Sequence, residues 1–339
     1  MAIEKKDLVF NWEKIQCRMK NNIDTNEEWG TSSLQARLCT GTLQLAYQRK
    51  SDLNNVVKKV QTVYSNSKHL GHLAEPSWIA NLPSSLPENL LFCGGDPSVG
   101  FDLWALTIGR SKLGMNIGNL PTPKTMHENW PDWIHDWLAE GYSAKYQIIQ
   151  LNGESMQKTP DDFAQNQLLV FTAINLFTAE EQNDTDYYGI AKGVLSNWKI
   201  KFPDLDTEKA DSRYYEHRSV SYLSVKCLCL LMLIYELNKL GQLSDAEMSN
   251  YLSWMQERVT ELERTEFTNA DCWIELLASE IIFAQLLKRK FIPENYASGS
   301  VYDLVKEINE NSNYGNGLAL LFIAYDAWNQ ESSHSIPQK

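Results

Sequence analysis

The sequence lacks a long apolar run and an apolar N-terminal stretch. Its longest uninterrupted apolar segment is Cys227–Tyr235, nine residues (CLCLLMLIY), whereas a membrane-spanning helix needs about 20. The N-terminus, MAIEKKDLVFNWEK, carries charges where a secretory signal peptide is apolar. We therefore expect a cytoplasmic protein that does not bind or cross a membrane.

Cysteine is scarce and its spacing is uninformative. The chain has 6 cysteines in 339 residues and no Cys-x-x-Cys pair, which argues against a disulfide scaffold, a zinc finger and a thioredoxin-like motif. Cys227 and Cys229 lie inside the apolar run, where a thiol behaves as a small hydrophobic group. A reducing compartment fits this pattern.

Basic charge is also in deficit. The formal net charge is −12, which argues against a nucleic-acid-binding protein and against binding to anionic membranes. Residues 1–110 carry 12 basic and 11 acidic side chains, while residues 111–339 carry 19 and 32. Such an excess can serve solubility alone, or it can form an acidic face for a basic protein partner.

No segment alternates apolar and polar residues at the period of a strand, whereas helical periodicity is widespread. Ser244 with Glu247 forms a capping box that opens a helix running to about Arg264. Thr159 to Asp162 has the pattern of another helix start, and a further helix is expected at Asp271–Lys290. Other helices are expected at 7–20, 32–49, 101–113, 131–151, 186–200, 213–240, 301–310 and 316–329.

These elements predict an all-α fold, either a multi-helix bundle or a helical-repeat-like array. The most apolar helix should be central and buried, through the side chains of Leu223, Leu228, Leu231, Ile234 and Tyr235. Residues 71–123 interrupt the pattern, because they contain 7 of the 17 glycines and 6 of the 11 prolines. We expect a helical region at 1–150 that includes this irregular segment, an acidic helical region at 151–330 and a tail at 331–339.

Motifs for cofactors and metals are missing. Asp161-Asp162 is not part of a DDxxD magnesium motif, and Gly94–Gly100 lacks the GK[ST] ending of a phosphate-binding loop. No HExxH occurs, although two sets of residues could be drawn together as metal ligands. We expect neither a metal nor a cofactor at these sets, which are His127, Glu128, His135 and Asp136, and His69 with His72.

One stretch leaves an enzymatic function open. Trp130–Trp137 (WPDWIHDW) predicts a helix with Asp132 and Asp136 on one face and Trp133 and Trp137 on another. Two carboxylates between aromatic side chains are typical of sugar-processing enzymes. The alternative is an amphipathic helix whose aspartates face water. Arg213–Arg218 offers a similar choice between a cleft wall and a solvated helix start.

Acidic residues concentrate in two parts of the C-terminal half. The denser one extends from Glu257 to Glu280 and includes Glu263 and Glu275; the other lies near residues 180–186. Both are candidates for an acidic docking surface, although a solvated charged face is the simpler interpretation. The candidate partner-binding residues are Glu180, Glu181, Asp184, Asp186, Glu257, Glu261, Glu266 and Asp271.

Two segments resemble helical immunity proteins of bacterial toxin–immunity pairs, particularly those that neutralise DNase toxins. They are Leu45–Leu53 (LAYQRKSDL) and Phe101–Gly109 (FDLWALTIG). The resemblance implies a protein without enzymatic activity that covers the basic active site of a cognate toxin. The alternative is an all-α enzyme with a tryptophan-lined cleft near residues 127–137 that acts on a carbohydrate or another small molecule.

Overall fold

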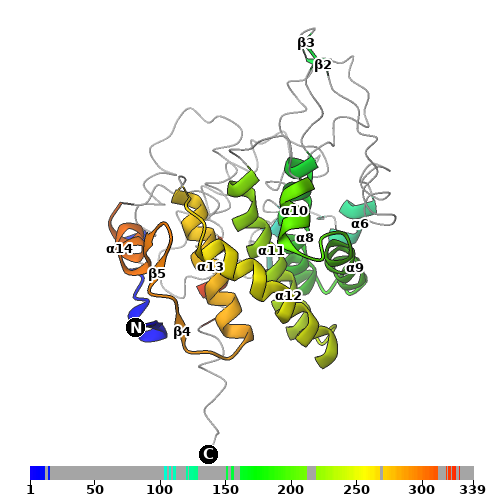
Figure 1. Cartoon of the computed structure of the whole chain (residues 1–339). Coiled ribbons are helices and arrows are strands. Elements are labelled where there is room, and N and C mark those ends of the chain that lie inside the picture. The colour runs from blue at the N-terminus through cyan, green and yellow to red at the C-terminus, as the bar shows by residue number, and fades with distance from the viewer. Residues whose placement is uncertain are drawn as a thin grey trace, which may run out of the picture.

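The computed structural model describes most of the C-terminal half of the chain and parts of the N-terminal half (Figure 1). The described residues are 1–11, 14–15, 103–104, 107, 110–111, 120, 122–128, 150–151, 154–155, 161–211, 219–267, 270–311, 318, 320–321, 323–325 and 328.

The described part is mainly helical, which confirms the expected all-α class. Three two-stranded antiparallel sheets join β1 (Ile3–Glu4) to β4 (Phe291–Ile292), β2 (Gln150–Leu151) to β3 (Glu154–Ser155), and β5 (Asn295–Tyr296) to β6 (Gly299–Ser300). None of the described helices is both long and apolar enough to span a membrane. The helices are η1 (Lys5–Asp7), α6 (Pro123–Glu128), α8 (Asp161–Gln182), α9 (Asp186–Lys201), α10 (Leu205–Asp211), α11 (Ser219–Lys239), α12 (Asp245–Glu263), α13 (Ala270–Leu286) and α14 (Val301–Asn311).

The longer helices form two layers. Helices α8, α11 and α13 run parallel in one layer, with α11 between the other two (Figure 1). Helices α9 and α12 pack against this layer, and each follows one of its helices through a short turn. The N-terminal ends of α11 and α13 therefore lie at one end of the molecule, and their C-terminal ends lie at the other.

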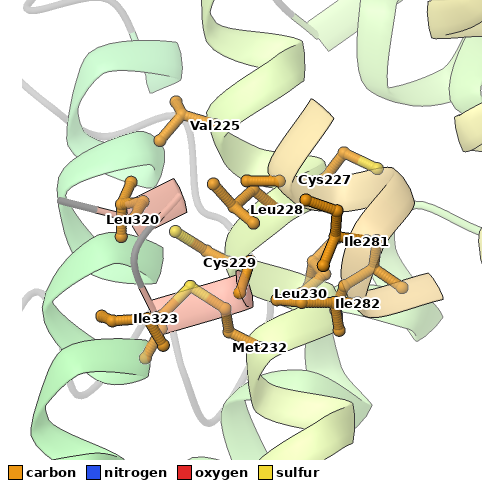
Figure 2. Packing of buried hydrophobic residues seen from close by; sticks show 14 of the residues in the cluster. Val225, Cys227, Leu228, Cys229, Leu230, Met232, Ile281, Ile282, Leu320 and Ile323 are labelled. Carbon is orange, nitrogen blue, oxygen red and sulfur yellow. The ribbon is translucent and has the colours of Figure 1, made fainter. Parts of the chain in front are cut away.

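Helix α11 is surrounded on all sides. Every residue from Leu223 to Ile234 is buried, which confirms the expected central helix. Figure 2 shows α11 side chains such as Leu228 and Met232 packed between Ile282 of α13 and Ile323 of the C-terminal helical residues. Tyr235 is the exception, because it is only half-buried at the edge of the core.

The predicted start of α12 is confirmed in detail. The Ser244 backbone N–H donates to Glu247 Oε2 at 2.8 Å, and the Glu247 backbone N–H donates to Ser244 Oγ at 3.3 Å. The Lys192 ammonium and Ser244 lower the pKa of Glu247 to about 2. Lys192 Nζ also donates to the Gln242 carbonyl at 2.8 Å, so α9 fixes the turn between α11 and α12.

One predicted helix start and two predicted helix ends are wrong. The helix expected at 7–20 does not include residues 8–11, which are not helical. The helix expected at 131–151 does not include its last two residues, because Gln150 and Leu151 pair with Ser155 and Glu154 in a short hairpin. The helix expected at Asp271–Lys290 ends at Leu286. Lys288 adopts a left-handed backbone (φ 53°), which turns the chain back so that Arg289 forms an ion pair with the buried Glu280.

Other predicted elements lie wholly or partly outside the described residues. The irregular segment predicted at 71–123 contains one expected helix, at 101–113. The residues described between Leu103 and Ser111 are helical, as expected. The predicted helix at 213–240 is described from Ser219 onward, and the one at 32–49 is not described. The region boundary expected near residue 150 stays a prediction.

The N-terminal segment, residues 1–11, is held by the C-terminal part of the chain. β1 pairs with β4, and the Lys5 N–H donates to the Lys290 carbonyl at 3.2 Å. Asn309 of α14 donates to the Val9 carbonyl at 2.9 Å and accepts from the Asn11 N–H at 2.7 Å.

Candidate protein-binding surface

The first acidic group lies where α8 turns into α9, and we call it the α8–α9 corner (Glu180, Glu181, Asp184 and Asp186). The chain turns through Asn183, whose backbone is left-handed (φ 59°). A single asparagine tolerates this conformation well, so the two helix ends come together with four carboxylates around the turn.

Neighbouring elements engage the carboxylates of the α8–α9 corner. Lys124 of α6 donates its backbone N–H to Asp184 at 2.9 Å and pairs its ammonium with Asp186 at 2.7 Å. Glu180 Oε1 lies 2.7 Å from Lys239 Nζ. Ser111 Oγ donates to Glu181 at 2.8 Å. These carboxylates therefore join α6, α8, α9 and α11, and the nearby cations neutralise much of their charge.

A fully buried carboxyl group lies beneath this corner. Lys239 Nζ is 3.1 Å from Glu236 Oε1, so the same ammonium bridges Glu236 and Glu180. Burial, followed by the hydrogen bond with Glu180, raises the pKa of Glu236 well above its usual range. Two carboxyl groups that share one lysine and one proton carry less negative charge than the sequence implies.

The second acidic group lies on the outer face of α12 and just beyond its C-terminus. We call it the α12 acidic end (Glu257, Glu261 and Glu266). Glu257 and Glu266 are exposed, and neither forms an ion pair with a residue that the structure describes. Glu261 is half-buried and pairs with Lys209 of α10 at 2.8 Å.

Buried contacts hold α12 from behind and orient this face outward. Arg258 is buried, and its Nη2 donates to the Phe202 carbonyl at 2.7 Å and to Glu208 Oε2 at 3.3 Å. Its guanidinium lies 4.1 Å from the Trp254 ring centroid, and Trp254 Nε1 donates to the same Phe202 carbonyl at 3.0 Å. Glu257 is exposed on the solvent side of the helix, whereas Glu261, seven residues after Trp254, lies at the edge of the buried face and is half-buried.

The buried network of Arg258, Trp254 and Glu208 was not predicted from the sequence. Arg258 lies in the apolar stripe of α12, one turn after Trp254 and beside Val259. A cation at such a position indicates a buried partner, and this was the available signal. The burial of its partner Glu208 could not be predicted in the same way, because acidic residues in the first turn of a short helix are usually solvated.

The remaining acidic residues of this neighbourhood contribute little charge to a surface. Glu275 and Glu280 are buried, so their expected place on a charged face is wrong. Burial raises the pKa of Glu275 to about 8, opposed by the Ser224 hydroxyl, which donates to it at 2.5 Å. Burial and the hydrogen bond with Glu263 raise the pKa of Glu280. Asp271 is half-buried, and burial raises its pKa as well.

The two acidic groups do not form one continuous surface. Glu180 meets Lys239 where α8 and α11 end, and Glu266 lies at the other end of the layers, before α13 begins. Helix α12 connects the two ends and has 19 residues, which corresponds to about 28 Å. A partner that covers one group leaves most of the other in solvent.

The enzymatic alternative falls largely outside the described residues. Residues 129–149, which include Asp132 and Asp136, are not described, and only the backbone of His127 and Glu128 is, within α6. Gly94–Gly100, His69, His72 and Arg213–Arg218 are also outside. Asp161 and Asp162 begin α8. Within the described part, no group of three or more metal-ligating side chains gathers.

Comparison with known proteins yields no relative. No protein-family model matches the chain, and no curated protein or solved structure is significantly similar to it.

Proposed function

We propose that this protein binds a basic protein partner through the α12 acidic end, and that the partner is a toxin whose active site it covers. In this role the protein is an immunity protein that acts in the cytoplasm and performs no catalysis itself. The observation that carries the proposal is the pair of exposed carboxylates, Glu257 and Glu266, which no described cation neutralises.

Charge placement favours the α12 acidic end over the α8–α9 corner. At the corner, Lys124 and Lys239 already occupy Asp186 and Glu180, so a partner would have to displace internal ion pairs. At the α12 acidic end, only Glu261 has a described cation partner. Carboxylates without such partners are available to form charge-assisted hydrogen bonds with Lys or Arg side chains.

The Arg258 network supports a preorganised surface. A helix fixed by buried contacts presents its outer side chains without first having to order its backbone, and this lowers the free-energy cost of association. A nuclease carries basic side chains where it contacts nucleic-acid phosphates. An acidic helix face placed over those side chains would compete directly with the nucleic acid.

The test is reversal of Glu257, Glu261 and Glu266 to Lys, with association measured against the purified product of the neighbouring gene. Glu257 and Glu266 are exposed, and such substitutions usually change stability by no more than about 0.5 kcal/mol. Glu261→Lys also removes the ion pair with Lys209, so circular dichroism first establishes that the triple variant is folded. Association should slow by at least about tenfold, since the attraction that steers the encounter is replaced by repulsion.

A matched control changes the net charge equally at another place. Reversal of Glu4, Asp186 and Asp245, which are also exposed and lie outside both the α12 acidic end and α14, should slow association much less. Wild-type association should slow as ionic strength rises past about 0.15 M, where the screening length is about 8 Å. Salt-independent association, or equal effects of the two triple variants, would contradict the proposal.

A further inference from the structure

A groove with a volume of about 540 Å³ separates the N-terminal segment from α14. Ile3 and Val305 are buried side chains that line it, and Val9 and Tyr302 are exposed side chains that line it. It shares no residue with the α12 acidic end, although Ser298, two residues before the lining residue Ser300, forms hydrogen bonds with Thr265 and Phe267 on either side of Glu266.

Exposed apolar side chains are concentrated at this groove. Within the described part of the chain, six large apolar side chains are exposed, and three of them, Met1, Val9 and Tyr302, line the groove. Val9 is 66% exposed and Tyr302 is 64% exposed. Apolar side chains gathered at one place on a surface, with charged groups around them, are typical of a protein–protein contact.

The walls of the groove are fixed before any partner arrives. Asn309 holds the backbone of Val9 and Asn11 through two hydrogen bonds. Elsewhere along the groove, the amino group of Met1 pairs with the carboxylate of Glu294 at 2.9 Å, and both residues line the groove. An occupant would therefore meet a preformed surface rather than having to order one.

The charges around the groove are balanced, unlike those of the whole chain. The lining includes three cationic groups, which are the Met1 amine, Lys6 and Lys306, and three carboxylates, which are Asp7, Glu294 and Glu310. The chain as a whole carries a formal net charge of −12. A strongly basic or strongly acidic partner would place like charges together here, which is unfavourable.

A second copy of this chain satisfies these conditions. Two molecules of charge −12 repel each other, so they associate most easily where each presents both signs beside exposed apolar side chains. A twofold axis brings the same patch of each copy together, and each contact between two residues then occurs twice.

We propose that this groove and the adjoining face of α14 form the contact between two copies of the chain. Tyr302 and Val9 of each copy would pack against those of the other copy, and Lys306 would face Glu310 of the partner subunit. A stable interface needs about 800 Å² per partner. The dimer therefore also covers the outer face of α14 around the groove and forms in a concentration-dependent way.

Sedimentation velocity of the full chain, without any toxin present, tests the proposal between about 1 and 200 μM, the range that reveals weak association. Wild type should shift from monomer to dimer as its concentration rises. Tyr302→Asp should raise the dissociation constant at least about tenfold, because a truncated aromatic anchor commonly costs that much. Ile200→Asp is the control, since Ile200 is 75% exposed on α9 and lies outside the groove.

A charge exchange provides an independent check. Lys306→Glu and Glu310→Lys should each weaken the dimer, and the double variant should recover at least part of the wild-type association. Circular dichroism establishes that each variant is folded. A monomer at every concentration, an equal effect of Ile200→Asp and Tyr302→Asp, or no recovery in the double variant would overturn the proposal.

Discussion

Among the residues that the structure describes, four carboxyl groups lie inside the protein, although acidic side chains are usually exposed. They belong to Glu208, Glu236, Glu275 and Glu280. Each is hydrogen-bonded or paired with a neighbour, as a buried polar group must be. The Ser224 hydroxyl donates a hydrogen bond to Glu275. The other three carboxyl groups form ion pairs: Glu208 with Arg258, Glu236 with Lys239, and Glu280 with Arg289.

The Glu275 carboxyl should make stability depend on pH. Its pKa is about 8 in the folded protein and 4.5 as an ordinary side chain, so the folded state holds the proton more tightly. The stabilisation is fully present below about pH 4.5 and is lost as pH rises to about 8. Since one pKa unit corresponds to about 1.4 kcal/mol, the loss amounts to a few kcal/mol.

Glu275→Gln should therefore be more stable than wild type at pH 9 and close to wild type at pH 4.5. Urea unfolding followed by circular dichroism at the two pH values measures the difference. An identical difference at both values would mean that Glu275 does not titrate in this range.

Arg258→Ala should lower the free energy of unfolding by about 3–5 kcal/mol, because it leaves the buried Glu208 carboxylate without this partner. The adjacent Glu257→Ala should change it by no more than about 0.5 kcal/mol, since Glu257 is exposed. Chemical denaturation of both variants makes the comparison. Equal effects would show that the Arg258 network does not anchor α12.

At the scale of the element, helix starts were easier to predict from sequence than helix ends. Ser244 and Glu247 cap α12 as expected because both partners of the capping box are local in sequence. The end of α13 was placed too late, because the three basic residues at 288–290 suit a helix C-terminus. Helix α13 ends at Leu286, and the chain then turns back so that Arg289 pairs with the buried Glu280. The burial of Glu280 cannot be read from the sequence around residue 286.

Two glycines offer a direct test of backbone and packing constraints. Gly299 has φ 145°, and a Cβ atom there would lie 2.7 Å from Cη2 of Trp273, so Gly299→Ala should destabilise by about 1–3 kcal/mol. Gly193 lies within α9, where a Cβ would meet nothing within 4 Å. Gly193→Ala should stabilise by about 0.4–1 kcal/mol. Thermal unfolding of both variants should give shifts of opposite sign, and a shared sign would refute this reading of the two sites.

At the scale of the molecule, the sequence predicted the helical class and the buried α11, but not the arrangement of the helices. Periodicity identifies which face of a helix is apolar, yet it does not say which other helix covers that face. For the same reason the candidate acidic residues were identified only as two stretches of sequence. Their location at opposite ends follows from the parallel course of α8, α11 and α13.

The pairing of β1 with β4 has a consequence for synthesis in the cell. Lys5 and its backbone partner Lys290 are 285 residues apart, and a ribosome adds roughly 5–20 residues per second. The N-terminal strand therefore waits roughly 15–60 seconds before its partner exists. During this time Ile3 and Leu8, which are buried in the finished fold, have no native site to occupy and are available to chaperones. The strand that is made 285 residues before its partner is thus among the last parts of this fold to reach its native place.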